Sequence, residues 1–347
     1  MIRLAIIGTG GMANDHAVKF KSIKGCELAA CCDIVPGRAK AFAEKHGIPK
    51  AYTDAEEMLK KERLDGISIV TIDKAHAPTA LLAIKYGLRV MCEKPLADNL
   101  RDARRMAEAA RARKLITAVN FSYRNCPATQ MAAKIAASGK LGRIMHVEGS
   151  YLQGRLVGKA WHKNEGLLWR LSTRHGSAGV LGDIGVHLFD FASFIVGDIA
   201  ALQCDLKTFN KGLKRIGPYV FDANDSMAAI VRFNNGALGT LHSSRWATGH
   251  ANTVALRVYG NKGGLDINLD RPAPETLRIC VGQDVDTNTW WPVKCPPVPD
   301  MYRRFIDAIK SGKQGQTSFE GGAQVQAYLD ASLKSAANGG KLIGIKN

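Results

Sequence analysis

The sequence has few of the features that mark secreted, membrane-spanning or disulfide-stabilised proteins. No apolar run approaches the ~20 residues that a membrane span needs. Met1 leads directly into a strand-like run, which leaves no room for a signal peptide and predicts a cytoplasmic location. The eight cysteines form no Cys-x-x-Cys pair and have no histidine at metal-ligand spacing. Free thiols in a reducing compartment are therefore expected, without a metal site.

Aromatic residues are also sparse, at 7% of the chain, which matters because the charge balance is strongly basic. There are 48 basic and 31 acidic residues, giving a formal net charge of +17. The densest basic stretch, residues 101–114, is Ala-rich and lacks aromatic residues for base stacking. It predicts the solvated face of a helix, so we expect no nucleic-acid partner. The diffuse positive charge would still attract small anionic ligands.

The length of 347 residues favours two domains. Hydrophobic content of 46% and charged content of 23% are ordinary for a soluble globular protein. No repeat or low-complexity linker divides the chain. Strands alternate with helices up to about residue 121, which predicts a doubly wound parallel sheet. The expected strands are residues 3–7, 26–32, 64–71, 89–92 and 115–121, and the expected helices are residues 12–23, 36–46, 54–60, 76–86 and 99–114.

After residue 122 the pattern changes. Residues 143–153 form a longer alternating run, typical of a sheet with one open face. Asn234-Asn235-Gly236 predicts a hairpin between strands 226–233 and 237–246. Further strands are expected at residues 253–259, 265–269, 277–281 and 292–295, and helices at 127–138, 179–196, 300–311 and 320–338. We therefore predict domains at residues 1–121 and 122–347, with a loop rich in Gly, Trp and Arg at 154–178.

The first strand ends in Gly8-Thr-Gly10-Gly11-Met-Ala13. Gly8 permits a tight turn, Gly10 lets a pyrophosphate approach the backbone, and Ala13 allows close packing of helix on strand. The amide groups at the helix start would then face the ligand. A glycine turn with a purely structural role is an equal alternative for this motif alone.

Asp33 follows the second strand, at about the distance where an acidic residue binds the ribose hydroxyls of NAD. It favours NAD over NADP because a carboxylate repels a ribose phosphate. An alternative is that Asp33 only caps the next helix, whose first turn would contain Pro36. Both roles are compatible.

Glu93-Lys94-Pro95 ends a parallel strand, where open α/β sheets bind ligands. Pro95 restricts the backbone of the residue before it, so Lys94 would enter the ligand cleft from a fixed position. An ordinary surface lysine before a turn is the alternative.

A second constellation lies on the helix expected at residues 179–196. Asp183 and His187 are four residues apart and would share one helix face. Histidine can take or give a proton near neutral pH, and a carboxylate one turn away can orient it. A surface pair or half of a metal site are the alternatives, but no further metal ligand is indicated.

In this order and spacing, the glycine turn, the Glu-Lys-Pro sequence and the Gly182-Asp183-x-Gly185-x-His187 segment resemble the glucose–fructose oxidoreductase, inositol dehydrogenase and rhizopine-catabolism (Gfo/Idh/MocA) family. The resemblance covers nearly the whole chain. It implies an N-terminal Rossmann domain and a C-terminal α/β domain whose large, mostly antiparallel sheet often forms a dimer or tetramer interface. It also implies hydride transfer between NAD or NADP and a sugar or cyclitol.

The resemblance also implies roles for individual residues. Lys94 would stabilise the reacting oxygen, His187 would exchange its proton, and Asp183 would be the accompanying carboxylate. The predicted cofactor-binding residues are Gly8, Gly10, Gly11, Met12, Ala13, Asp33, Ile34, Arg38, Thr71, Ile72, His76, Glu93, Lys94 and Asn120. The predicted substrate-binding residues are Lys94, Tyr123, Gln153, Trp169, Arg170, Asp183 and His187.

Three points stay open at this stage. Arg38 is where family members that accept NADP often have an arginine, and Thr71-Ile72-Asp73 stands where the family usually has Thr-Pro-Asn. A redox-neutral NAD-dependent glycosidase and a non-enzymatic dinucleotide or sugar sensor are the alternative functions. Retention of Lys94, Asp183 and His187 argues against the sensor. The sequence does not identify the sugar; Gln153, Trp161, His162 and Arg170 are candidates for contacting it.

Overall fold

The computed structural model describes residues 1–158, 160–270 and 274–345. The chain divides into a first unit, Met1–Phe121 with Pro299–Gln326, and a second unit, Ser122–Val298 with Ala327–Asn347. The change of unit after residue 121 coincides with the predicted boundary. Residues 299–326 differ from the prediction, because they belong to the first unit although they follow the second in sequence.

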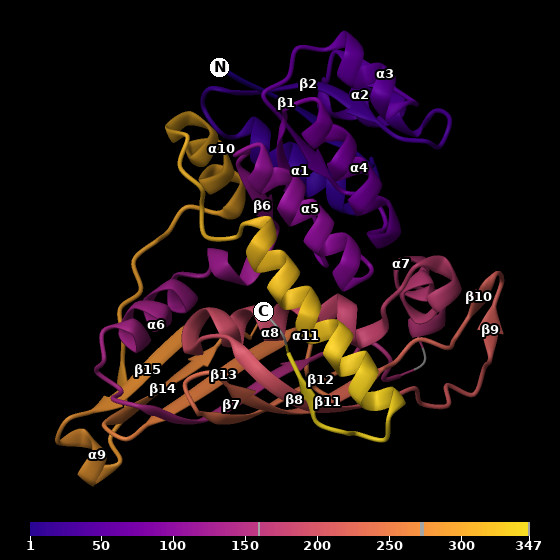
Figure 1. The fold of residues 1–347 in the computed structure, drawn as a ribbon. Helices are drawn as coiled ribbons and strands as arrows, with labels where there is room; N and C mark the ends of the chain where they lie inside the picture. Colours follow the sequence, from indigo (N-terminus) through magenta and orange to yellow (C-terminus); the bar gives the residue numbers. More distant parts are fainter. Residues whose placement is uncertain (159, 271–273, 346–347) are drawn as a thin grey trace. The chain divides into compact units, whose positions relative to one another are not determined.

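A six-stranded parallel sheet forms the centre of the first unit (Figure 1), in the order β3-β2-β1-β4-β5-β6. This order confirms the predicted doubly wound sheet. The strands are β1 Ile2–Ile7, β2 Cys26–Cys32, β3 Lys50–Tyr52, β4 Gly66–Ile69, β5 Arg89–Cys92 and β6 Thr117–Val119. The sequence did not predict β3, which is short and mostly exposed and so lacks an apolar pattern.

The helices between these strands are α1 Gly11–Lys21, α2 Arg38–His46, α3 Ala55–Lys61, α4 Asp73–Lys85 and α5 Leu100–Ala112. Their ends follow the capping signals in the sequence. The side chain of Asp54 accepts a hydrogen bond from the amide of Glu57, and that of Asn99 accepts one from the amide of Asp102. Pro36 lies before α2 rather than in its first turn, and Asp33 does not cap that helix, because the N-cap residue is Gly37.

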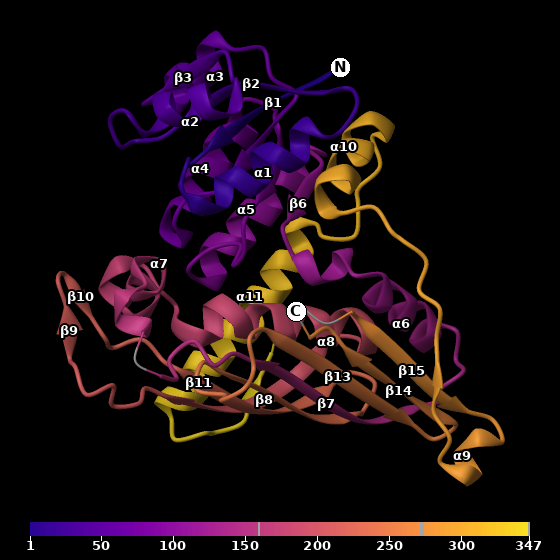
Figure 2. The ribbon, with the colours of Figure 1, turned by 180° about the vertical axis from the view of Figure 1, so that it is seen from behind.

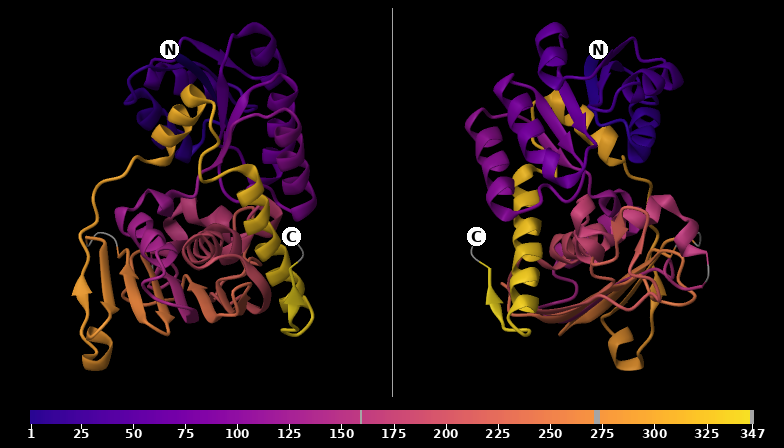
Figure 3. Two further views of the ribbon diagram at one scale, coloured as in Figure 1. Left: turned by 60° about the vertical axis from the view of Figure 1, so that its left-hand side comes forward. Right: turned by 90° about the vertical axis from the view of Figure 1, so that its right-hand side faces the viewer.

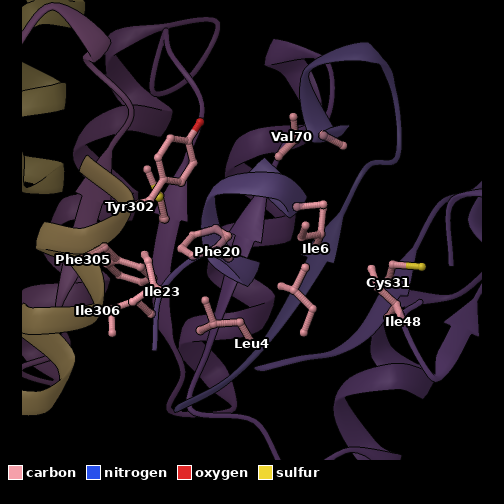
Figure 4. Close-up of a cluster of buried hydrophobic side chains, with 14 of the residues drawn as sticks. Leu4, Ile6, Phe20, Ile23, Cys31, Ile48, Val70, Tyr302, Phe305 and Ile306 are labelled. Atoms are coloured by element: carbon pink, nitrogen blue, oxygen red, sulfur yellow. The ribbon is translucent and has the colours of Figure 1, made fainter. Parts of the chain in front are cut away.

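Helix α10, Met301–Ser311, belongs to the first unit because its apolar face packs on α1. Figure 4 shows Phe305 and Ile306 of this helix beside Ile23 and near Phe20. Tyr302, Phe305 and Ile306 are all nearly or fully buried and belong to the same core cluster as Phe20. Burial of this face explains why a segment so late in the chain completes the first unit.

The second unit contains a nine-stranded mixed sheet in the order β16-β15-β14-β13-β7-β12-β11-β8-β17. Most neighbours are antiparallel, as predicted, whereas β7 and β12 run parallel. The strands are β7 Ile144–Leu152, β8 Ile199–Lys207, β11 Ser226–Phe233, β12 Leu238–Ser244, β13 Thr253–Gly260, β14 Gly263–Asn268, β15 Thr276–Val281, β16 Trp291–Pro292 and β17 Ile343–Gly344. The predicted hairpin at residues 234–236 joins β11 to β12.

Helices α6, Pro127–Ala137, and α8, Val186–Val196, lie on one face of this sheet (Figures 1 to 3). Exposed and buried residues alternate along β11 and β12. One set of side chains therefore packs under the helices and the other faces away from them. Among the described residues, no helix covers that second face, which we call the open face. The change of unit at residue 327 falls within α11, Phe319–Ala337.

Two regions of the second unit differ from the prediction. The helix expected at 179–196 begins with a π-helical turn, Leu181–Gly185, before α8. The predicted loop at 154–178 contains α7, Glu165–Leu168, and short 3-10 turns. Leu167, Leu168 and Leu171 of this segment form a small separate core with Phe221, beside the hairpin of β9 Arg215–Ile216 and β10 Tyr219–Val220. Among the described residues, no helix has the length and apolarity needed to cross a membrane.

Candidate active site

The glycine turn after β1 leaves space at the start of α1. Gly8 has a φ of +90°, and a Cβ there would lie 2.5 Å from the carbonyl oxygen of Val70, so a larger residue would not fit. A Cβ on Gly10 or Gly11 would meet nothing within 4 Å. No described side chain caps α1, so its first amide groups are not occupied by a side-chain cap. The turn thus fits an anionic ligand such as a dinucleotide pyrophosphate.

Met12 and Ala13, which follow the turn, face in different directions. Ala13 is fully buried and belongs to the core, as expected for close packing of α1 on the sheet. The side chain of Met12 is exposed. A small core residue and an exposed thioether beside the turn are both compatible with the predicted cofactor site.

Asp33 is buried at the carboxyl end of β2 and fastens the glycine turn. Its Oδ2 accepts hydrogen bonds from the Thr9 amide at 2.8 Å and the Thr9 hydroxyl at 3.0 Å, and its Oδ1 accepts one from the Val35 amide at 2.9 Å. Burial alone would raise the pKa of Asp33, but these hydrogen bonds and the charge of Arg38 lower it. Asp33 is therefore ionised at neutral pH. The exposed Ile34 and Arg38 lie beside it, with an Arg38 guanidinium nitrogen 3.7 Å from Oδ2.

The next part of the site lies between β4 and α4. Ile72 is the N-cap residue of α4 and its side chain is exposed. His76, by contrast, is fully buried. Its Nδ1 lies 2.9 Å from the Pro95 carbonyl oxygen and its Nε2 lies 3.2 Å from the Thr71 carbonyl oxygen. A neutral imidazole carries one N–H, so His76 can donate to one of these two carbonyl oxygens, and its predicted role in cofactor binding stays a prediction.

Glu93, at the end of β5, is the centre of a buried polar network. Its Oε1 lies 2.9 Å from His16 Nε2 and accepts a hydrogen bond from the side-chain nitrogen of Asn120, Nδ2, at 2.6 Å. That nitrogen also lies 3.2 Å from the hydroxyl of Tyr302. Burial alone would raise the pKa of Glu93, but His16, Lys94 and Asn120 together lower it to about 2. An ionised carboxylate is thus held beneath the strand end.

Lys94 follows Glu93 and is partly exposed, and its peptide bond to Pro95 is cis. The Lys94 amide donates a 3.2 Å hydrogen bond to Glu93 Oε2. Because Gly8, Asp33 and Lys94 all follow parallel strands of one sheet, they share its carboxyl edge. The structure brings these three predicted residues to the same side of the first unit.

In the second unit, His187 lies near the start of α8 and is 8% exposed. Its ring meets that of Tyr123 edge-on, with centroids 5.1 Å apart, and the ring of Tyr151 lies 6.4 Å away. The Tyr123 hydroxyl donates to the Tyr151 hydroxyl at 2.8 Å. Burial raises the pKa of Tyr151, so its phenol stays protonated. His187 is therefore next to a pair of neutral phenols.

Asn252 joins these phenols to Gln153. Its Oδ1 accepts hydrogen bonds from the Tyr151 hydroxyl at 2.8 Å and from the Gln153 amide at 2.7 Å, and its Nδ2 lies 3.0 Å from the Tyr123 oxygen. The sequence nominated Tyr123 and Gln153 but missed Tyr151 and Asn252. Tyr151 is a buried residue on β7, where an aromatic residue gives no signal distinct from a core position.

Asp183 lies in the π-helical turn and is bound by arginines that the sequence analysis did not place there. Its Oδ2 accepts a 2.8 Å hydrogen bond from the fully buried Arg245, which follows β12, and lies 3.5 Å from Arg170 Nε. The Arg170 guanidinium lies 4.5 Å from the centre of the Trp169 ring. Three of the predicted substrate-binding residues, Asp183, Trp169 and Arg170, thus lie close together, with Arg245 as an addition.

Arg124 directly follows Tyr123, one of the predicted substrate-binding residues. Arg124 is buried and forms a bidentate ion pair with Asp190 of α8, with N–O distances from 2.6 to 3.1 Å. Its guanidinium also lies 4.2 Å from the centre of the Phe194 ring. Arg124 therefore has a packing role within the second unit.

The first unit offers a lysine ammonium, which can stabilise a developing negative charge. The second unit offers an imidazole, which can transfer a proton, and a carboxylate neutralised by two arginines. Within the described residues, no group of three His, Cys, Asp or Glu side chains is arranged to hold a metal ion.

Comparison with known proteins gives matches along most of the chain. Residues 2–121 match the model of an oxidoreductase family with an NAD-binding Rossmann fold, and residues 129–266 match the GFO/IDH/MocA C-terminal domain. D-glucoside 3-dehydrogenase of Escherichia coli is 31% identical over 252 residues, covering 70% of each chain. Myo-inositol 2-dehydrogenase of Thermotoga maritima is 27% identical, covering 96% of each.

Solved structures are similar over the full length. A levoglucosan dehydrogenase in complex with NADH and L-sorbose has a TM-score of 0.88 at 25% identity, covering 100% of this chain and 99% of that one.

Proposed function

Because the chain belongs to the Gfo/Idh/MocA family of NAD-binding oxidoreductases, we propose that it transfers a hydride between NAD and a ring hydroxyl or carbonyl of a sugar or cyclitol. The observation that carries this proposal is the arrangement of the first unit. The open glycine turn, the ionised Asp33 and Lys94 all follow strands of one parallel sheet, at its carboxyl edge. The names of the relatives support a pyranose or cyclitol as substrate.

The residues of the first unit fit the cofactor. Gly10, Gly11 and the start of α1 would hold the pyrophosphate, and Asp33 would accept hydrogen bonds from the ribose. The carboxylate of Asp33 supports NAD over NADP, and Arg38 beside it is the group that would tolerate a ribose phosphate. When bound, the nicotinamide supplies or accepts the hydride.

The chain's own residues would handle the proton and the charge. In oxidation, His187 accepts the hydroxyl proton, and the Lys94 ammonium stabilises the oxygen as it becomes an alkoxide. Arg170 and Arg245 compensate the negative charge of Asp183. Its carboxylate would still accept a hydrogen bond from a sugar hydroxyl. Tyr123 and Gln153 would contribute further hydrogen bonds to the substrate. Reduction uses the same groups in reverse.

Substitution of Lys94 and His187 tests these assignments. Lys94→Ala and His187→Ala should each lower kcat by about a thousandfold, because each removes a group that acts on the reacting oxygen. The affinity for NAD, measured by titration calorimetry, should change little. Full activity of both variants in a panel of sugars and cyclitols would refute the roles of these residues.

The same panel separates the alternative functions. A dehydrogenase releases NADH in proportion to the free monosaccharide or cyclitol consumed. A redox-neutral glycosidase would cleave a glycoside without net NADH. A sensor would bind dinucleotide or sugar without turnover of any member of the panel.

We also propose that the open face of the nine-stranded sheet forms a homodimer or homotetramer interface. Ile230 and Leu238 on this face are 47% and 46% exposed, and a neighbouring hollow of about 590 Å³ is lined in part by Arg257, Asp266 and Arg278. Ile230→Asp should shift the mass measured by light scattering toward the monomer. Leu213→Asp, at an exposed leucine outside this sheet, is the control and should leave the mass unchanged.

The state of the cysteines supports the proposed cytoplasmic location. All eight are free thiols, and six of them are buried. Burial raises the pKa of Cys31 to about 11 and that of Cys32 to about 12. Thiols in this state are unreactive, as expected for structural cysteines in a reducing compartment.

A further inference from the structure

We propose that two buried histidines, His16 and His76, act as a clamp that positions Lys94 for catalysis. The inference rests on the proposed function and adds to it a pair of positioning residues remote in sequence from Lys94. His16 comes from α1 and His76 from α4, and both are fully buried. Each binds one of the two residues that flank Lys94.

His16 holds the residue before Lys94. Because Glu93 is ionised, its oxygens only accept hydrogen bonds, so the nitrogen of His16 that faces it must carry a hydrogen. This Nε2–H donates to Glu93 Oε1 at 2.9 Å, while Nδ1 lies 2.8 Å from the Ser68 hydroxyl. The second oxygen of Glu93 accepts the Lys94 amide hydrogen. The carboxylate thereby connects the His16 ring to the Lys94 backbone.

His76 holds the residue after Lys94. A proline has no amide hydrogen, so its carbonyl oxygen is its one backbone hydrogen-bonding group. That oxygen in Pro95 lies 2.9 Å from His76 Nδ1. The other ring nitrogen faces the Thr71 carbonyl oxygen, at the end of the adjacent β4. With its hydrogen on Nδ1, which makes the shorter contact, His76 donates to Pro95 and ties the turn after Lys94 to α4.

Fixing both neighbours matters because Lys94 has a long flexible side chain. The position of its ammonium depends on where its backbone starts, and a displacement of about 1 Å in a catalytic group can lower the rate about a hundredfold. The clamp also engages one Glu93 oxygen with His16 and Asn120, which fixes the orientation of the carboxylate.

Asparagine and glutamine variants test the clamp, because their amide nitrogens mimic different ring nitrogens. The Asn nitrogen stands near the position of histidine Nδ1, and the Gln nitrogen near that of Nε2. His16 binds Glu93 through Nε2, and His76 binds Pro95 through Nδ1. His16→Gln and His76→Asn should therefore retain kcat within about threefold, whereas His16→Asn and His76→Gln should lose about 10- to 100-fold, as is typical for supporting groups.

Two further measurements separate positioning from a general loss of structure. The Kd for NADH, from nicotinamide fluorescence, should change less than about threefold in His16→Asn, since His16 is not among the predicted cofactor-binding residues and the glycine turn and Asp33 are untouched. Competitive acetylation at pH 9, read by mass spectrometry, should show slower labelling of Lys94 relative to the exposed Lys85 in His16→Asn. The carboxylate released from His16 would then be able to turn closer to the Lys94 ammonium and protect it further.

His46→Leu is the matched control. His46 is also a buried histidine of the first unit, but its Nε2 lies 2.9 Å from the Asn14 side-chain oxygen, away from residues 93–95. This variant should keep both kcat and the labelling of Lys94.

Equal behaviour of the Asn and Gln variants at either position would overturn the clamp, whether both are active, both inactive or both unfolded. The labelling experiment needs no turnover, so its result stands apart from the proposed reaction. A wild-type protein that oxidises no sugar, yet shows the expected labelling pattern, would contradict the function and not the clamp.

Discussion

Glu93 in the first unit and Asp190 in the second are both buried carboxylates next to a basic side chain, yet their pKa values move in opposite directions. Glu93 accepts hydrogen bonds from His16, Asn120 and the Lys94 amide, and its pKa falls to about 2. Burial raises the pKa of Asp190 in spite of its bidentate pair with Arg124. A single cation compensates burial less well than several donors from different elements.

The largest expected effect comes from removing the only cation bound to Asp190 in the described residues. Arg124→Met should lower the free energy of unfolding by about 3–5 kcal/mol, because it leaves a carboxyl group buried without its partner. The double variant Arg124→Met with Asp190→Leu should recover much of this loss, since it removes the polar group as well. Urea denaturation measures both. A cost below about 1 kcal/mol for the single variant would show that the pair is not needed.

Glu93→Gln should have the next largest effect. The pKa of Glu93 in the folded protein, about 2, lies below its ordinary value of 4.5, so ionisation stabilises the fold. This contribution is fully present above pH 4.5 and is lost as the pH falls toward 2. It corresponds to about 3 kcal/mol at neutral pH. The stability difference from the wild type, measured in urea, should be constant from pH 7 to about 5 and shrink at lower pH.

Asp190→Asn should show the opposite dependence on pH. The pKa of Asp190 is raised in the folded protein, so the folded state holds its proton more tightly and stability falls as the pH rises above 3.8. Asparagine does not titrate. The stability advantage of the wild type over this variant should therefore decrease with rising pH. A parallel course for the Glu93 and Asp190 variants would invalidate the comparison.

The smallest expected effect concerns Asp33, a buried carboxylate at the carboxyl edge of the same sheet as Glu93. Asp33→Asn should raise the preference for NADP relative to NAD by about tenfold in kcat/KM, which is about 1.4 kcal/mol, because it removes the repulsion of a ribose phosphate. Arg38→Met removes the neighbouring positive charge instead and should lower the kcat/KM for NADP relative to that for NAD. An unchanged ratio in both variants would indicate that neither residue meets the ribose.

Much of the first unit could be predicted because its signals are local. Gly8 specifies a turn through its backbone freedom, and Asp54 and Asn99 specify two helix starts through side chains that cap nearby amides. The apolar runs mark the central strands. The assignment of α10 to this unit could not be predicted, because a helix with an apolar face shows that it packs without showing on what.

The polar contacts around the candidate site also divide into residues that a local pattern indicates and partners that lie far away in the sequence. His16 occupies the apolar face of α1 together with Phe20 and Ala13, so a polar residue at a core position was visible in the sequence. Its partner Glu93 was not, since 77 residues separate the two. Arg245 and Asn252 approach Asp183 and Tyr151 only through the pairing of the nine-stranded sheet and its loops, which no spacing rule describes.

Deuterium transfer tests the proposed reaction most directly. The protein would be incubated with NAD and with glucose, methyl glucoside or myo-inositol carrying deuterium on every ring carbon. Mass spectrometry should detect NADH that is one mass unit heavier, in an amount equal to the oxidised sugar or cyclitol. Deuterium that returns to a cleaved sugar without net NADH, or no transfer from any of the three, would contradict the proposed dehydrogenase.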